Sequence, residues 1–131
     1  VYSAGARERA MEHMAYYSQQ RLLGEHVPYP IEAWPEGNQR HLSAESALYC
    51  RIVTEGIFGI RPTGFNSFSL CPQLPDKLNS MRLNNVSAFA FSPFDIIVER
   101  QGNKIKTYVL RNGKPVKTYH TENGKDINIT F

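Results

Sequence analysis

Cysteine is scarce in this sequence. Cys50 and Cys71 are the only two in 131 residues, whereas small disulfide-stabilised domains carry several pairs. Cys50 falls inside a predicted helix and Cys71 at the end of a predicted strand. Two buried thiols that act as small apolar groups are therefore the favoured interpretation, and a single bridge in an exported protein is the alternative.

Long apolar runs and clusters of basic residues are also absent. No hydrophobic segment reaches the length that spans a bilayer, so no membrane partner is expected. The net charge is only +3, and the lysines and arginines are scattered. Nucleic acid is not an expected partner, because a binding face needs clustered positive charge. Neither a glycine-rich phosphate loop nor a metal-ligand spacing occurs, and no cofactor or metal is expected.

What is present describes an ordinary globular protein, with 41% hydrophobic and 11% aromatic residues. The length allows one domain, or two small pieces packed together. The sequence starts with Val1 and enters a predicted helix almost at once, so we expect the C-terminal piece of a longer polypeptide. A complete small protein with a processed N-terminus is the alternative.

Two helices are predicted in the first part of the chain. Apolar and small residues recur at spacings of three and four over 4–23, and Gly24 is a plausible stop. A second helix is predicted over 43–58, with Ser43 as the N-cap and Pro62 barring any continuation. Two helices cannot bury both of their faces alone, so we expect further helices from a missing N-terminal region, a partner chain, or cover from the sheet.

After Pro62 the pattern changes to the alternation typical of strands. Three dipeptides, Gly102-Asn103, Asn112-Gly113 and Asn123-Gly124, have the residues that two-residue hairpin turns require. The fold class is therefore predicted as α+β, with two N-terminal helices followed by an antiparallel β-sandwich. Pro115 is expected on an edge strand or at a strand start. Strands are predicted at 67–71, 81–84, 86–91, 94–101, 104–111, 116–120 and 127–131.

The segment 28–45 between the two helices is longer than such a connection needs. It combines aromatic residues with carboxylates, amides, an arginine and a histidine, which is the mixture that sugar sites use. We expect an oligosaccharide or polysaccharide as the partner of this loop. The candidate catalytic residues are Glu32 and Glu36, and the candidate substrate-binding residues are Trp34, Asn38, Gln39, Arg40 and His41.

Each candidate has a structural alternative. Glu32 and Glu36 form the only close carboxylate pair in the loop, but a spacing of four in a proline-broken segment does not fix their separation. Trp34 either stacks on a sugar or anchors the loop. Arg40 either holds a substrate carboxylate or pairs with a glutamate of the protein. His41 either bonds a sugar hydroxyl or is satisfied by backbone.

Three runs of sequence carry a family resemblance: 35–51 (PEGNQRHLSAESALYCR), 55–64 (EGIFGIRPTG) and 70–75 (LCPQLP). In order and spacing they resemble the C-terminal end of six-hairpin α/α-barrel glycoside hydrolases, the bacterial group that includes α-L-rhamnosidases and α-L-fucosidases. The resemblance implies that 1–62 is the end of the barrel domain and its closing helical hairpin. It also implies that 63–131 is a C-terminal β-sandwich domain.

The same resemblance implies a function for the parent protein. It would be a periplasmic or secreted enzyme that hydrolyses plant or host glycans by carboxylate acid/base chemistry. Residues 28–42 would line part of its sugar pocket, and this chain alone would be inactive. The alternatives are a non-catalytic carbohydrate-binding module built on the sheet, and a structural domain whose helices dock a partner chain.

Overall fold

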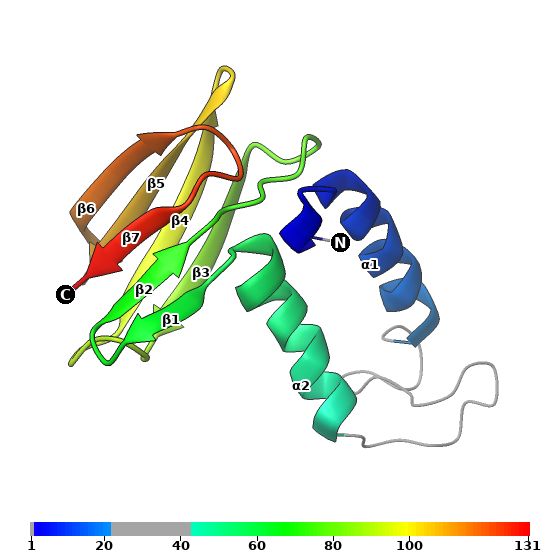
Figure 1. The fold of residues 1–131 in the computed structure, drawn as a ribbon, viewed down its shortest axis with the longest axis horizontal. Coiled ribbons are helices and arrows are strands. Elements are labelled where there is room, and N and C mark those ends of the chain that lie inside the picture. Colours follow the sequence, from blue (N-terminus) through cyan, green and yellow to red (C-terminus); the bar gives the residue numbers. More distant parts are fainter. Residues whose placement is uncertain (1, 22–42) are drawn as a thin grey trace.

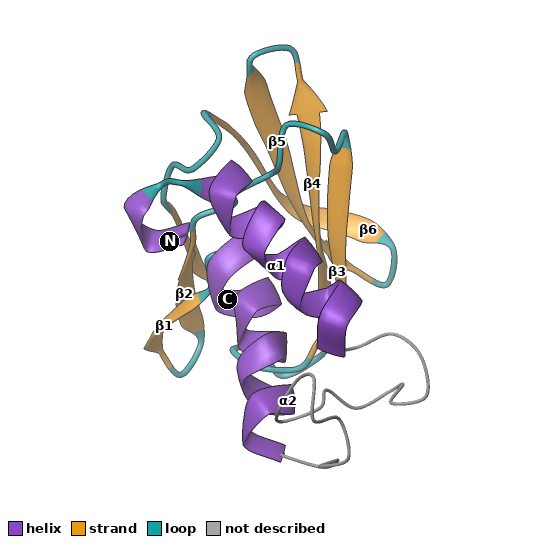
Figure 2. Ribbon diagram, turned by 90° about the vertical axis from the view of Figure 1, so that its right-hand side faces the viewer, coloured by secondary structure: helices purple, strands orange, loops and turns teal. Residues whose placement is uncertain are grey.

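The computed structural model describes residues 2–21 and 43–131, and it divides into a helical part and two antiparallel sheets (Figure 1). The helical part has a short 3-10 turn, η1 (Tyr2–Ala4), and the helices α1 (Arg7–Arg21) and α2 (Ser43–Arg51). A wider π-helical turn, η2 (Ile52–Ile57), continues α2. The helices lie together at one end of the sheets rather than across a sheet face (Figure 2).

Seven strands form the sheets. One sheet has the order β1-β2-β7 and the other has the order β3-β4-β5-β6, and every pairing is antiparallel. The strands are β1 (Arg61–Gly64), β2 (Ser67–Leu70), β3 (Ser80–Val86), β4 (Phe94–Gln101), β5 (Lys104–Arg111), β6 (Lys114–Thr121) and β7 (Ile127–Thr130).

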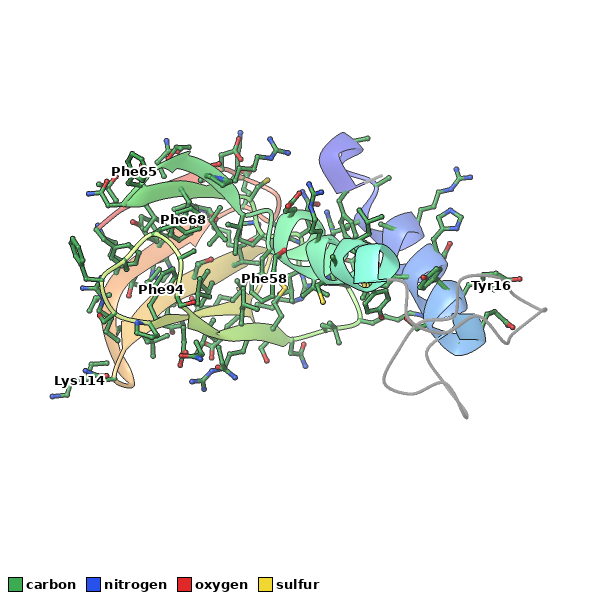
Figure 3. The ribbon with its side chains drawn as sticks, turned by 90° about the horizontal axis from the view of Figure 1, so that it is seen from below. Tyr16, Phe58, Phe65, Phe68, Phe94 and Lys114 are labelled. Carbon is green, nitrogen blue, oxygen red and sulfur yellow. The ribbon has the colours of Figure 1, made fainter. Side chains whose placement is uncertain are left out.

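One hydrophobic core lies between the two sheets. Along β4 and β5 every second residue is buried, as expected of strands with one face turned inward. Of its phenylalanines, Phe58 lies next to the helices, and Phe68 and Phe94 lie toward the other end of the sheets (Figure 3). The principal core residues are Phe68 and Leu70 on β2, Phe94, Ile96 and Val98 on β4, Ile105 and Val109 on β5, and Ile127 and Ile129 on β7.

The α+β class and both helices are confirmed, with changes at their ends. The predicted helix 4–23 starts later, because Gly5 adopts a left-handed φ of +74° that separates η1 from α1. The predicted helix 43–58 changes to π-type hydrogen bonding after Arg51. Among the described residues, no helix is long and apolar enough to cross a membrane.

Most predicted strands are confirmed, and β4 and β5 have the predicted bounds. Pro115 lies on β6, at the edge of its sheet, as expected. The hairpins at Gly102-Asn103 and Asn112-Gly113 are also confirmed by their antiparallel pairings. The prediction missed β1, whose four residues are all exposed and therefore show no alternation.

The predicted strand 86–91 is wrong. Residues 87–93 form a loop, in which Phe89 has a left-handed φ of +64°. The two phenylalanines of this loop therefore do not share a face. The ring of Phe89 packs on Phe68 with centroids 4.9 Å apart, whereas Phe91 is fully exposed. Burial of one ring overrides the local preference for extended backbone.

The predicted hairpin at Asn123-Gly124 is also wrong, because β6 and β7 belong to different sheets. Gly124 does take a positive φ of +82°. The side-chain amide of Asn123 accepts a hydrogen bond from the Leu74 backbone N–H (2.9 Å) and donates one to the Leu74 carbonyl (2.7 Å). The dipeptide therefore lies in the connection from β6 to β7, and the Asn123 side chain holds this connection to Leu74.

Candidate functional site

All the candidate sugar-site residues lie outside the described residues. They occupy the segment between the end of α1 and the start of α2, and the structure assigns them no position. The set comprises Glu32, Trp34, Glu36, Asn38, Gln39, Arg40 and His41. The structure does describe the helices that precede and follow this segment.

Contacts near the end of α1 join it to the last turn of α2. The rings of Tyr17 and Tyr49 stack with centroids 5.8 Å apart. The Ser18 hydroxyl and the Tyr49 hydroxyl share a hydrogen bond of 2.7 Å, and Ser18 also donates to the Met14 carbonyl. These contacts lie within one turn of Arg21, where α1 ends. The two helices therefore contact each other through Tyr17, Ser18 and Tyr49.

An apolar cavity of about 340 Å³ lies between these helices. Aromatic rings and thioether or aliphatic groups dominate its wall, and His13 adds one imidazole. Such a surface can accept an apolar side chain or a ring face, but it has few hydrogen-bonding groups to orient a sugar. Its lining includes Tyr2, His13, Met14, Tyr17, Tyr49 and Ile52.

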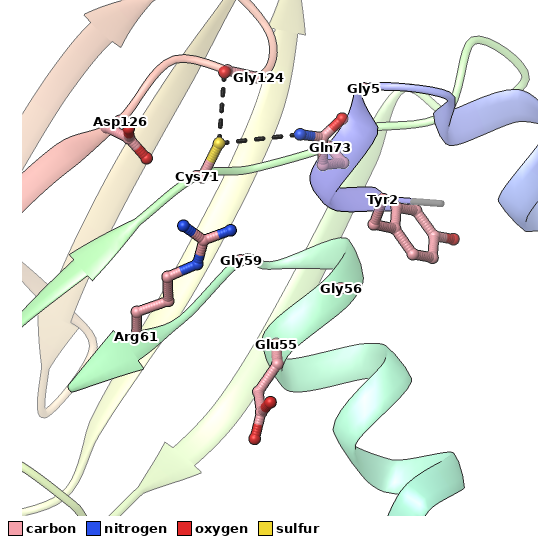
Figure 4. A pocket seen from close by; sticks show the side chains of 10 residues that line it. All are labelled: Tyr2, Gly5, Glu55, Gly56, Gly59, Arg61, Cys71, Gln73, Gly124 and Asp126. Carbon is pink, nitrogen blue, oxygen red and sulfur yellow. Dashed lines mark hydrogen bonds between the residues drawn. The ribbon is translucent and has the colours of Figure 1, made fainter.

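A second, more polar cavity of about 260 Å³ lies where the helical part meets the sheets (Figure 4). Five parts of the chain bring its side chains together: η1, η2, the start of β1, the segment after β2 and the segment before β7. No local pattern in the sequence predicts this cavity. Its principal side chains are Tyr2, Glu55, Arg61, Cys71, Gln73 and Asp126.

The segment 71–75 forms the floor of this junction, and most of it is buried. Its backbone bonds to both sides of the joint. The Gln73 N–H donates to the Ile57 carbonyl on the helical side (2.8 Å). On the sheet side, the Gly124 N–H donates to the Pro72 carbonyl (2.8 Å). The backbone of segment 71–75 therefore connects the helical part to the sheets through hydrogen bonds on both sides.

The Cys71 thiol sits inside this network. It donates to the Gly124 carbonyl at 3.2 Å and accepts a hydrogen bond from the Gln73 side-chain amide at 3.7 Å (Figure 4). Partial burial raises the pKa of Cys71, and the nearby Asp126 carboxylate raises it further. Arg61 and the Gln73 bond oppose this rise, but the net direction is upward. The thiol therefore stays protonated near neutral pH and is a weak nucleophile.

Both cysteines are free, so the alternative of a bridge between them is wrong. The expectation that both thiols are buried is also wrong, because Cys50 is exposed on α2. All the α2 residues whose burial is described are exposed except Tyr49, which is half-buried, so no packed face of α2 covers Cys50.

We expect the two thiols to react with an aromatic disulfide reagent in two phases. Cys50 should react first, and Cys71 about tenfold or more slowly at neutral pH, because partial burial and a raised pKa both reduce its thiolate. The measurement is the release of the coloured thiolate over time. Because folding raises the pKa of Cys71, the protonated thiol stabilises the folded state. This stabilisation is complete at pH values below the pKa of the thiol in the unfolded chain, and it is lost as the pH rises through the pKa of Cys71 in the folded chain. Cys50→Ser should remove only the fast phase, and a single phase in the unmodified chain would contradict this assignment.

Glu55, the glutamate of the junction cavity, is not a candidate for the acid of glycoside hydrolysis. Arg51 holds the Glu55 carboxylate through two hydrogen bonds of 2.6 and 2.8 Å, and this bonding lowers the pKa of Glu55. An ionised, engaged glutamate cannot serve as the protonated acid of glycoside hydrolysis. In the parts of the chain that are described, no group of three or more His, Cys, Asp or Glu could hold a metal ion.

Comparisons of the chain with family models, with curated proteins and with solved structures find no match.

Proposed function

We propose that this chain is the C-terminal part of a glycoside hydrolase of the six-hairpin α/α-barrel kind. In this proposal, α1 and α2 are the closing hairpin of the barrel, and the two sheets form the β-sandwich packed beside it. The parent enzyme acts on plant or host glycans and is periplasmic or secreted. Residues 28–42 line part of its sugar pocket.

The observation that carries the proposal is the open apolar surface of the helix pair. Leu48 on α2 is 55% exposed and Tyr16 on α1 is 62% exposed, and Ile52 is also open. Within 7–21 and 47–57 only Ala10 is a buried apolar residue. Large apolar side chains on helices are normally covered, and neighbouring barrel helices would cover these.

The rigid joint between the helices and the sheets supports the same proposal. The backbone bonds of segment 71–75 fix the end of η2 to the sheet side. Arg7 on α1 pairs with Asp76 at 3.2 Å, and Glu8 accepts a hydrogen bond from the Asp76 N–H at 2.9 Å. These contacts tie α1 and η2 to the segment that leads into the second sheet, as expected of a barrel end packed on a β-sandwich.

In the proposed pocket, Trp34 stacks on the apolar face of a sugar ring, and Asn38, Gln39, Arg40 and His41 bond its hydroxyl or carboxylate groups. Glu32 and Glu36 are the candidates for the acid and for the nucleophile or base. Hydrolysis requires a protonated carboxyl group that donates to the glycosidic oxygen and an ionised one that attacks the anomeric carbon or activates water there. The resemblance places the usual catalytic pair on earlier barrel loops, so the isolated chain is expected to be inactive.

Sugar binding by the chain tests the proposal. We expect glycan oligosaccharides to change the fluorescence of Trp34, the only tryptophan, and Trp34→Ala to weaken binding by about tenfold in calorimetry. Tyr16→Ala is the matched control, because it removes an exposed aromatic ring outside the loop and should leave the affinity unchanged. Absence of binding, or turnover of aryl glycosides by these 131 residues alone, would contradict the proposal.

The second candidate function is a non-catalytic carbohydrate-binding module, and the separate core of the two sheets favours it. That core is built from β2, β4, β5 and β7 and is largely independent of α1. In this case the sugar site would lie on the sheets. Oligosaccharide binding that persists after residues 1–62 are removed would favour this function over the loop.

A further inference from the structure

The end of the sheets farthest from the helices presents two phenylalanines to solvent. Phe65, in the turn between β1 and β2, is 105% exposed, and Phe91, in the loop between β3 and β4, is 110% exposed. No other large apolar residue among the described ones exceeds 62%. Figure 3 shows Phe65 and Lys114 at this end, with Tyr16 far from them on the helical side. We call the turn 65–66, the loop 87–93 and the hairpin 111–114 the aromatic tip.

Phe131 joins the three segments of the aromatic tip. Its N–H donates to the Asn66 carbonyl, and its carbonyl accepts a hydrogen bond from the Asn66 side chain, both at 2.9 Å. Its ring lies 4.7 Å from that of Phe94, where the loop 87–93 ends. The guanidinium of Arg111 lies 4.5 Å from the centre of the same ring. The tip is therefore one connected surface.

The loop 87–93 is built to expose Phe91. Phe89 adopts a left-handed φ of +64°, which is costly for a bulky residue. With this backbone the Phe89 ring packs 4.9 Å from the ring of Phe68. Phe91 then projects outward two residues later. A strained, anchored loop that exposes an apolar ring points to a function of that ring rather than to loose chain.

The charge of the aromatic tip is positive. Arg111 and Lys114 lie in its hairpin, and none of its three segments contains Asp or Glu. Asp95, the first carboxylate after the loop, is already engaged by the Asn85 N–H and by Arg82 at 2.7 Å. These bonds lower the pKa of Asp95 and keep its charge paired. Lys114 is exposed, whereas Arg111 is partly covered through its contact with the Phe131 ring, so Lys114 is the most accessible positive charge of the tip.

We propose that the aromatic tip docks the protein peripherally on an anionic phospholipid surface. Phe65 and Phe91 insert at the boundary between headgroups and acyl chains, and Arg111 and Lys114 face the lipid phosphates. The early expectation of no membrane partner concerned spanning segments, and this proposal replaces it for surface binding. The proposal does not depend on the glycoside hydrolase assignment.

The exposure of the rings favours lipid over other occupants. A ring that stacks on a sugar rests one face on the protein, whereas Phe65 and Phe91 are exposed on both faces. Phenylalanine also has no polar group to bond a hydroxyl. A second copy of this chain would bring the cations of one tip against those of the other, which is unfavourable.

Flotation with vesicles tests the proposal with the full chain. Vesicles of equal parts phosphatidylcholine and phosphatidylglycerol should bind it, and vesicles of phosphatidylcholine alone should bind it weakly. Phe65→Ala and Phe91→Ala should each reduce the partition coefficient about tenfold. Lys114→Ala should reduce it about fivefold. Phe91→Trp should retain binding, because tryptophan favours the membrane interface.

Two control variants match these changes on other parts of the surface. Tyr16→Ala removes an exposed aromatic ring from α1, and Lys104→Ala removes an exposed lysine from the hairpin at the opposite end of β5. Both should bind vesicles like the unmodified chain. Vesicle binding that is absent, or that Phe65→Ala and Phe91→Ala leave unchanged, would overturn the proposal. Binding to an acidic polysaccharide or self-association, lost in the same variants and without vesicle binding, would overturn it as well.

Discussion

Replacing Gly59 with alanine is expected to destabilise the protein by about 3–5 kcal/mol. Gly59 has a φ of +66°, and a Cβ atom built on it would lie 2.3 Å from the Cys71 carbonyl oxygen and 2.8 Å from the Cys71 Cβ. The Cys71 N–H donates to the Gly59 carbonyl at 3.2 Å, so the two segments cannot separate without losing this bond. The position therefore combines backbone strain with a steric clash at the joint between the helices and the sheets.

Gly102→Ala separates these two causes. Gly102 has nearly the same φ, +62°, but nothing lies within 4 Å of its added Cβ. We expect this control to cost only the left-handed penalty of about 1–2 kcal/mol. Urea denaturation followed by circular dichroism gives both free energies of unfolding. If both variants lost the same free energy of unfolding, the close contact between Gly59 and Cys71 would be contradicted.

The regular strands could be predicted because their residues carry a local signal. In β4 the apolar residues Phe94, Ile96 and Val98 recur at every second position and form the inward face. The hairpin at Asn112-Gly113 follows from two residues that tolerate positive φ, observed here at +50° and +74°. In these places local propensity and tertiary packing agree.

The errors arise where a distant contact decides the local structure. Phe89 and Phe91 are spaced as in a strand, but the Phe89 ring packs on Phe68 and the segment forms a loop. The dipeptide Asn123-Gly124 has hairpin composition, but its amide binds Leu74, which is far away in sequence. No pattern within a short window contains these partners.

The candidate sites divide in the same way. The sugar-site prediction rests on the composition of one continuous segment and on a family resemblance, so it could be made from sequence and stays a prediction. The junction cavity takes side chains from Tyr2, Arg61, Cys71 and Asp126, which only the fold brings together. A weak signal was present in the run 70–75, whose two prolines and buried apolar residues are unusual for a surface turn.

Phe68→Ala is expected to remove about 3–5 kcal/mol of stability. The Phe68 side chain is fully buried, and its ring lies 4.9 Å from Phe89, 5.7 Å from Phe94 and 6.3 Å from Phe131. Removing it leaves a cavity that three large rings cannot fill without leaving their own positions. The midpoint of urea denaturation should fall while its slope changes little.

Phe65→Ala is the matched control for this change, because it removes the same side chain three positions earlier. The ring of Phe65 is fully exposed, so its loss should change the free energy of unfolding by no more than about 0.5 kcal/mol. The pair thus assigns the two rings opposite roles: Phe68 stabilises the fold, and Phe65 is available to a partner. If Phe65→Ala proved as destabilising as Phe68→Ala, the ring of Phe65 would have to be buried, and the docking role of the aromatic tip would fail with it.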